Sequence, residues 1–320
     1  MTWWPLIKVL PQKTNLHFVK YARYAAVLSV VLCVASIVSC FYPGLNMGID
    51  FRGGASMQIT KPAGQFLDVG AVRESVAKLG LGDVQVQGID NDSNALLTFQ
   101  VPEGETQSGV VTRVESAVTE AVGQVTYSGV NVVGSKVSGE LFTSGLLALG
   151  VAIVLMFAYI WFRFEPQFGF GAVAGLLHDV ILTFGLIVLF RLEFSLNMVA
   201  AILTVIGYSM NDTVVVFDRL RENLRKYKTM PLRDVIDLSL NETLSRTIIT
   251  GVTAVMVLGA LAVFGGEALF GFSVALMFGI IIGTYSSIYV GAPIILLWGV
   301  KRGELAEDAK PVKLGMASRP

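Results

Sequence analysis

The stretch from residue 268 to residue 300, ALFGFSVALMFGIIIGTYSSIYVGAPIILLWGV, contains no charged side chain. About 20 helical residues cross the hydrocarbon core of a membrane, so this stretch is long enough to span one. Only 15 % of the 320 residues are charged, 53 % are hydrophobic, and Lys+Arg balance Asp+Glu at 24 each. These values exclude an ordinary soluble enzyme, a disordered chain and a nucleic-acid-binding protein that depends on excess positive charge. The sequence therefore predicts a polytopic membrane protein.

Five further charge-poor stretches give six predicted transmembrane helices. We place them at 24–45, 141–162, 168–190, 194–217, 247–265 and 269–298. Lys and Arg cluster before the first helix, between the fourth and fifth, and after the sixth. Because such residues favour the cytoplasmic side, we expect cytoplasmic segments at 1–23 and 301–320. The region 46–140 then lies on the opposite side, and it carries 11 acidic and 6 basic residues.

The region 46–140 alternates between strand-like and helix-like patterns. Alternating residues predict strands at 56–60, 84–87 and 97–101 and from 125, and apolar residues at helical spacing predict helices at 69–79 and 110–122. The order βαββαβ is that of a ferredoxin-like α+β domain. We expect no catalytic residue there, since the region has no Cys or His and its acids are scattered.

Two glycine-flanked charges lie where the chain enters this domain, and we interpret the segment as a hinge or a tight junction. A plain turn is an equally good interpretation, because glycine also permits the backbone angles of ordinary turns. The residues are Gly48, Asp50, Arg52, Gly53 and Gly54.

Asp212 is the most informative residue, because a carboxylate within a span is costly and usually faces a partner or a hydrated cavity. Arg246 begins the fifth span at a similar depth, and Thr250 follows one helical turn later. We expect either a static Asp212–Arg246 ion pair or a titrating carboxyl with a cationic regulator, while Glu242 competes for Arg246. The polar residues beside Asp212 are Tyr208, Ser209 and Asn211.

Further polar side chains lie near the middle of the third and sixth spans. His178 and Asp179 are on the third, and Ser286 and Ser287 are on the sixth. They predict either a hydrated proton path or hydrogen bonds between helices. No nucleotide-binding or metal-binding motif occurs, so we expect no cofactor, no metal and no enzymatic activity.

Six segments resemble the SecF branch of the SecD/SecF family, from the bacterial Sec protein-export machinery. The resemblance covers about residues 20 to 300. The segments are 46–54 (NMGIDFRGG), 159–165 (YIWFRFE), 177–180 (LHDV), 206–219 (IGYSMNDTVVVFDR), 243–247 (TLSRT) and 283–287 (GTYSS).

This resemblance implies a fold, a set of partners and a role for two residues. The six spans would form half of a bundle related to resistance-nodulation-division exporters, in the bacterial inner membrane, with the paralogue SecD as the other half. The complex would use the proton-motive force to draw unfolded secretory polypeptides outward beside the SecYEG channel and accessory subunits such as an insertase. Asp212 and Arg246 would serve proton transit. The alternatives are a half-size proton-driven small-molecule exporter of the same superfamily and a non-transporting scaffold.

Overall fold

The computed structural model describes residues 14–299, apart from 63, 83, 90–92 and 103–104. The predicted tail at 301–320 and most of the predicted N-terminal segment lie outside these residues. The chain divides into two compact units. We call them the helical unit and the sheet unit. The helical unit comprises Met1–Leu45, Ala152–Leu192 and Ala200–Pro320, and the sheet unit comprises Asn46–Val151 and Glu193–Val199.

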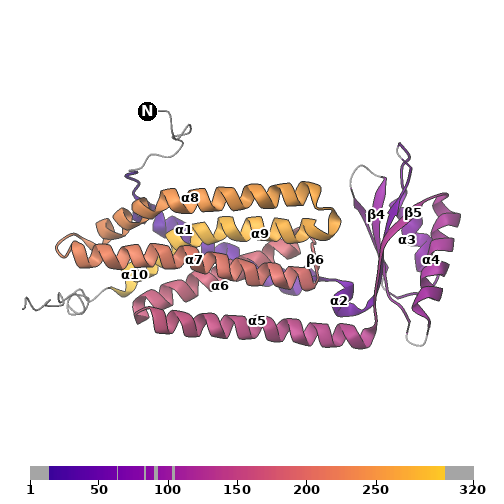
Figure 1. The fold of residues 1–320 in the computed structure, drawn as a ribbon, viewed down its shortest axis with the longest axis horizontal. Helices are drawn as coiled ribbons and strands as arrows, with labels where there is room; N and C mark the ends of the chain where they lie inside the picture. The colour runs from indigo at the N-terminus through magenta and orange to yellow at the C-terminus, as the bar shows by residue number, and fades with distance from the viewer. Residues whose placement is uncertain (1–13, 63, 83, 90–92, 103–104, 300–320) are drawn as a thin grey trace, which may run out of the picture. The chain divides into compact units, whose positions relative to one another are not determined.

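The described part of the chain contains six helical stretches that are long and apolar enough to span a membrane, which confirms the predicted fold class (Figure 1). The last of them continues α9 through a π-helical turn, η2, into α10. A similar turn, η1, ends the first. The elements are α1 (Phe18–Ser39), η1 (Cys40–Gly44), α5 (Ser135–Arg163), α6 (Pro166–Leu189), α7 (Leu196–Lys226), α8 (Leu232–Phe264), α9 (Glu267–Ser286), η2 (Ser287–Gly291) and α10 (Ala292–Trp298).

Helices α7 and α8 both extend beyond the predicted spans 194–217 and 247–265. The charged residues in the extensions hid them from a search for charge-free stretches. Apolar side chains in the same segments recur at helical spacing, and Leu220, Leu224, Val235 and Leu240 are buried in the core of the helical unit. The two helices therefore continue as an amphipathic hairpin.

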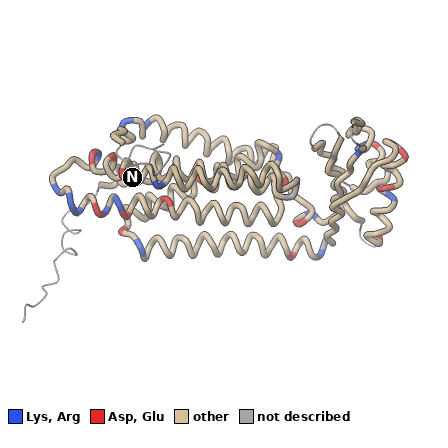
Figure 2. The backbone as a smooth tube through the Cα atoms, turned by 45° about the horizontal axis from the view of Figure 1, so that its top comes forward, with Lys and Arg blue, Asp and Glu red and all other residues tan. Residues whose placement is uncertain are grey.

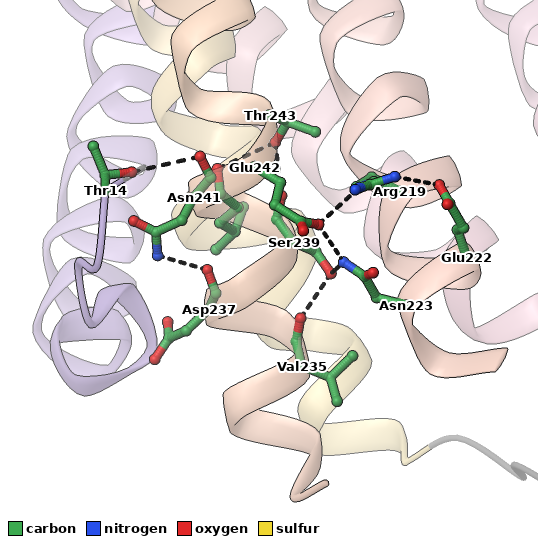
Figure 3. A network of polar contacts seen from close by, with 11 residues as sticks. Thr14, Arg219, Glu222, Asn223, Val235, Asp237, Ser239, Asn241, Glu242 and Thr243 are labelled. Carbon is green, nitrogen blue, oxygen red and sulfur yellow. Dashed lines mark hydrogen bonds and ion pairs between the residues drawn. The ribbon is translucent and has the colours of Figure 1, made fainter. Parts of the chain in front are cut away.

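A polar network joins this hairpin to the start of α1 (Figure 3). The side chain of Asn241 accepts a hydrogen bond from the Leu16 amide at 2.9 Å and donates one to the Leu16 carbonyl at 2.8 Å. Asp237 accepts from the amide of Val19 at 2.9 Å, which satisfies a free donor in the first turn of α1. The network fixes where α1 begins relative to α8.

Glycines allow the helices of the helical unit to approach closely. A Cβ atom on Gly279 of α9 would collide with the side chain of Val205 on α7. On Gly171 of α6 it would lie 2.7 Å from the carbonyl oxygen of Gly291. Small residues at such contacts are the usual means of packing helices within a membrane.

The sheet unit has the predicted ferredoxin-like topology. Its four strands lie in the order β3-β4-β2-β5, and all neighbouring strands are antiparallel. Helices α3 and α4 pack on one face, where alternate residues of β2, such as Met57 and Ile59, are buried with Val72 and Val114 (Figure 1). The elements are β2 (Gly54–Thr60), α3 (Val69–Ala77), β3 (Gln85–Ile89), β4 (Asn94–Phe99), α4 (Gln107–Val122) and β5 (Thr126–Val133).

A second, two-stranded sheet lies in the same unit. Strand β1 (Asn46–Met47) pairs in parallel with β6 (Glu193–Phe194), although the two are far apart in the sequence. The short helix α2 (Ile49–Arg52) follows β1, and α7 starts directly after β6. Within the sheet unit, this sheet brings the glycine-flanked segment 46–54 against residues 193–199.

Replacing Gly279 with Ala should destabilise the protein, because the added methyl group overpacks the contact with Val205, at a cost of about 1–3 kcal/mol. The apparent melting temperature of the purified full chain in detergent should fall by several degrees. Gly150→Ala on α5 is the matched control, since a Cβ there would meet no atom within 4 Å. An equal melting temperature for the two variants would contradict this contact.

Candidate functional site

Two carboxyl groups lie inside the helical unit, at the level of the predicted spans. Asp179 on α6 is completely buried, and Asp212 on α7 is 7 % exposed. An ionised carboxylate in apolar surroundings is expensive unless nearby donors or charges compensate for the lost water. The groups that surround these two side chains therefore decide what they can do.

Asp179 is held by three side chains from two neighbouring helices and its own. His178 Nδ1 lies 2.9 Å from Oδ1 of Asp179. The hydroxyls of Ser209 on α7 and Ser286 at the end of α9 donate to Oδ2 at 2.5 Å and 2.7 Å. Four of the residues predicted to lie on a proton path are thus brought together.

The hydrogen bonds continue from His178 to α1. Its Nε2 atom lies 3.2 Å from the Ser29 hydroxyl, which lies 3.0 Å from the Tyr285 hydroxyl. The Tyr285 hydroxyl donates in turn to the carbonyl of Ala25 at 3.0 Å. The two partners of the imidazole fix its orientation between α6 and α1.

Asp212 is held by hydroxyl groups from two other helical segments. Thr247 on α8 donates to Oδ1 at 2.6 Å, and Ser287 in η2 donates to Oδ2 at 3.0 Å. Ser287 follows Ser286 directly, so adjacent residues bind the two buried carboxyls. They lie where α9 passes into a π-helical turn, a distortion often found at functional sites.

Arg246 forms no ion pair with Asp212, although both residues lie in the described part of the chain. Its side chain is exposed on α8, as is that of the neighbouring Thr250. Glu242 does not bind Arg246 either, because its carboxylate accepts from Arg219 at 2.7 Å and from Asn223 at 2.6 Å (Figure 3). Asp212 and Arg246 therefore form no direct ion pair in this structure, although the charge of Arg246 still acts on Asp212 from a greater distance.

Two other predicted site residues lie apart from both carboxyls. Asn211 is exposed on α7. The hydroxyl of Tyr208 is buried, and no described residue forms a hydrogen bond with it. Neither side chain joins the two clusters.

The predicted hinge residues lie in the sheet unit, where their contacts are specific. The Asp50 carboxylate accepts a hydrogen bond from the amide of Leu196 at 2.9 Å, and the Gly48 amide donates to the carbonyl of Phe194 at 3.0 Å. Gly53 and Gly54 have positive φ angles of 73° and 126°, which favour glycine. The remaining residue of the set, Arg52, ends α2.

The sequence did not single out Ser29 or Thr247 as site residues. A lone hydroxyl in an apolar span carries little signal, because it often bonds its own helix backbone. Thr247 did lie in the segment 243–247, one of those that resemble the family, and this was the available signal. Within the described residues, no group of three His, Cys, Asp or Glu side chains is arranged to hold a metal ion.

Two family models match the chain. The model for the C-terminal part of the protein export membrane proteins SecD and SecF matches residues 113–301, which include both buried carboxyls. The model for the SecD/SecF GG motif matches residues 38–60, which include the segment 46–54.

Curated relatives match almost the whole chain. The protein translocase subunit SecF of Cereibacter sphaeroides is 47 % identical over 95 % of this chain and 96 % of its own length. The SecF subunit of Rhodobacter capsulatus is 42 % identical over 94 % of each chain. The SecDF subunit of Brucella abortus is 36 % identical over 97 % of this chain but only 41 % of its own length.

A solved structure has the same fold. The crystal structure of SecDF from Thermus thermophilus, a translocon-associated membrane protein, superposes with a TM-score of 0.80 at 28 % identity. The match covers 91 % of this chain and 39 % of that one. Fold, motifs and relatives agree: the chain belongs to the SecD/SecF family of protein-export membrane proteins and corresponds to its SecF part.

Proposed function

We propose that this chain couples the proton-motive force to the movement of secreted polypeptides across the inner membrane, after they enter the SecYEG channel. Its family membership makes it a multi-pass membrane subunit with an auxiliary role in Sec export. The observation that carries the proton coupling is the pair of buried carboxyls, of which Asp212 is held by hydroxyl groups and by no ion pair.

A hydroxyl shell suits a carboxyl group that changes its protonation state. A hydroxyl donates a hydrogen bond to a carboxylate, and after rotation it accepts one from the carboxylic acid. An Arg partner can only donate, so it would favour the charged form throughout. Thr247 and Ser287 therefore allow Asp212 to bind and release a proton within a fixed structure.

The two buried carboxyls are linked through adjacent residues, Ser286 and Ser287. One binds Asp179 and the other binds Asp212, so a small movement of η2 alters both shells together. The exposed Arg246 would then act when a partner or a conformational change brings it toward Asp212. His178 belongs to the proposed proton path, because its two ring nitrogens contact Asp179 and the Ser29 hydroxyl on α1.

The charge distribution supports the proposed orientation. Lys and Arg gather at the end of the helical unit where α7 turns into α8, and the middles of the helices are almost free of charge (Figure 2). By the positive-inside rule, that end and both termini are cytoplasmic, and the domain in region 46–140 is periplasmic. Moving one charge across 100 mV is worth about 2.3 kcal/mol, which is the energy source we propose.

The proposed partner is SecD. SecDF proteins match this chain over about 40 % of their own length, and we propose that SecD supplies the counterpart of the remaining part. In the most apolar part of each of the spans formed by α1, α5 and α8, only 6 % of the residues are buried within this chain. The rest of this apolar surface is available to a partner or to lipid. The relatives above are protein translocase subunits, and this favours export over the small-molecule exporter or the scaffold.

Replacing Asp212 with Asn should abolish proton-dependent export while the complex with SecD still assembles, because Asn keeps the size of the side chain but cannot carry a proton. The measurement is export of a reporter protein into membrane vesicles, with and without a proton gradient, together with copurification of SecD. Asp218→Asn is the control, since Asp218 lies on the same helix but is exposed and paired with Arg163. Normal gradient-dependent export by Asp212→Asn would remove this residue from the mechanism.

Ser286→Ala should slow gradient-dependent export and lower stability by about 1–3 kcal/mol, because Asp179 loses a buried donor. Ser273 offers a matched control on the same helix, since its hydroxyl is buried and no described residue bonds to it. Ser273→Ala should therefore leave both export and melting temperature close to wild type. Equal effects of the two substitutions would show that the bond to Asp179 is unimportant.

A further inference from the structure

Two segments of the sheet unit, 46–54 and 193–199, each carry a carboxylate. Each carboxylate accepts a hydrogen bond from the backbone of the other segment. Asp50, in α2, accepts a hydrogen bond from the amide of Leu196, the first residue of α7. Glu193, in β6, accepts one from the amide of Ile49, the first residue of α2. Each carboxylate thus satisfies a free donor at the start of a helix in the opposite segment.

Strand pairing also holds the same two segments together. Residues of β1 and β6 pair as parallel strands, Asn46 with Glu193 and Met47 with Phe194. The approach is so close that a Cβ atom on Gly48 would lie 2.5 Å from the Glu193 carboxylate. Only glycine fits this position without displacing that side chain.

Aromatic side chains of the two segments also contact each other. The ring of Phe51 lies 5.5 Å from that of Phe194 and 5.5 Å from that of Phe142 on α5. Because Phe51 follows Asp50 and Phe194 follows Glu193, the rings of Phe51 and Phe194 connect the two segments beside the residues that carry the carboxylates.

We propose that Asp50 and Glu193 are positioning residues that form a reciprocal clasp between the segment 46–54 and the start of α7. Through this clasp, a displacement of the domain that follows Gly54 is passed to α7, the helix that carries Ser209 and Asp212. The clasp is a property of the sheet unit and does not depend on whether Asp212 carries protons.

The stability of the clasp also depends on pH, through the protonation of Glu193. Burial raises the pKa of Glu193, the bond from the Ile49 amide partly opposes this, and the negative charge of Asp50 raises the pKa further. The neutral acid still accepts through its carbonyl oxygen and is no longer repelled by Asp50. Because its pKa is raised in the closed clasp, Glu193 stabilises the clasp below its ordinary pKa, and this contribution disappears as the pH rises through the raised value.

Other charged groups near the clasp have partners of their own. Arg52, on α2, takes part in an interaction of its own. Arg191, two residues before Glu193, donates to the carbonyl of Gly44 at 3.0 Å. Asp50 is a charged group that acts on the Glu193 carboxyl, and its negative charge raises the pKa of Glu193.

The test is hydrogen–deuterium exchange of segments 46–54 and 193–199 in the complete chain with its partner, corrected for intrinsic exchange rates. Glu193→Ala and Asp50→Ala should each accelerate exchange about fivefold in both segments, since each removes a helix cap. Glu120→Ala, an exposed carboxylate on α4, should change neither. Acceleration confined to the mutated segment, or in neither, would overturn the clasp.

A second measurement keeps the proposal testable if the alanine variants misfold, which would also accelerate exchange in β2. Wild-type exchange should be slower at about pH 5 than at about pH 7.5. Glu193→Gln keeps the oxygen acceptor but cannot titrate, so exchange should be slow and equal at both pH values. A pH difference that persists in Glu193→Gln, or its absence in the wild type, would overturn the role of Glu193.

Discussion

A carboxyl group buried among membrane-spanning helices must find hydrogen-bond donors within the protein, and the structure of the helical unit depends on this constraint. Asp179 and Asp212 draw their donors from α6, α7, α8 and the junction of α9 with η2. Because water is absent from the hydrocarbon core, each lost donor would leave an uncompensated polar atom. The carboxyls thus specify which helices are neighbours and which faces they turn to one another.

Close packing makes these short hydroxyl bonds feasible. Serine and threonine have short side chains, so their hydroxyls reach a carboxyl on another helix only when the backbones approach closely. A Cβ on Gly283 would lie 3.1 Å from Cβ of Ser209, the residue that donates to Asp179. The glycines at these helix contacts are therefore also a condition for the polar site.

The proposed proton site and the clasp occupy different parts of the same helix, α7. Its first residue is capped by Asp50, and Asp212 lies further along it. A helix transmits axial displacement because its backbone hydrogen bonds are continuous. A proton-dependent change around Asp212 and a movement of the segment 46–54 would therefore affect each other through α7 without a direct contact between the two sites.

The sequence by itself determined the six spans, the βαββαβ order, the family and the rarity of charge within the spans, because hydropathy and periodicity are local properties. It also marked Asp179, Asp212 and Ser286 as unusual. Only the tertiary structure decided which donors they receive, that Arg246 forms no direct ion pair with Asp212, and that Ser29 joins through His178. Nothing in the sequence marked Glu193, because its partner, Ile49, is distant along the chain. Contacts between remote segments depend on how helices pack, which no short stretch of sequence specifies.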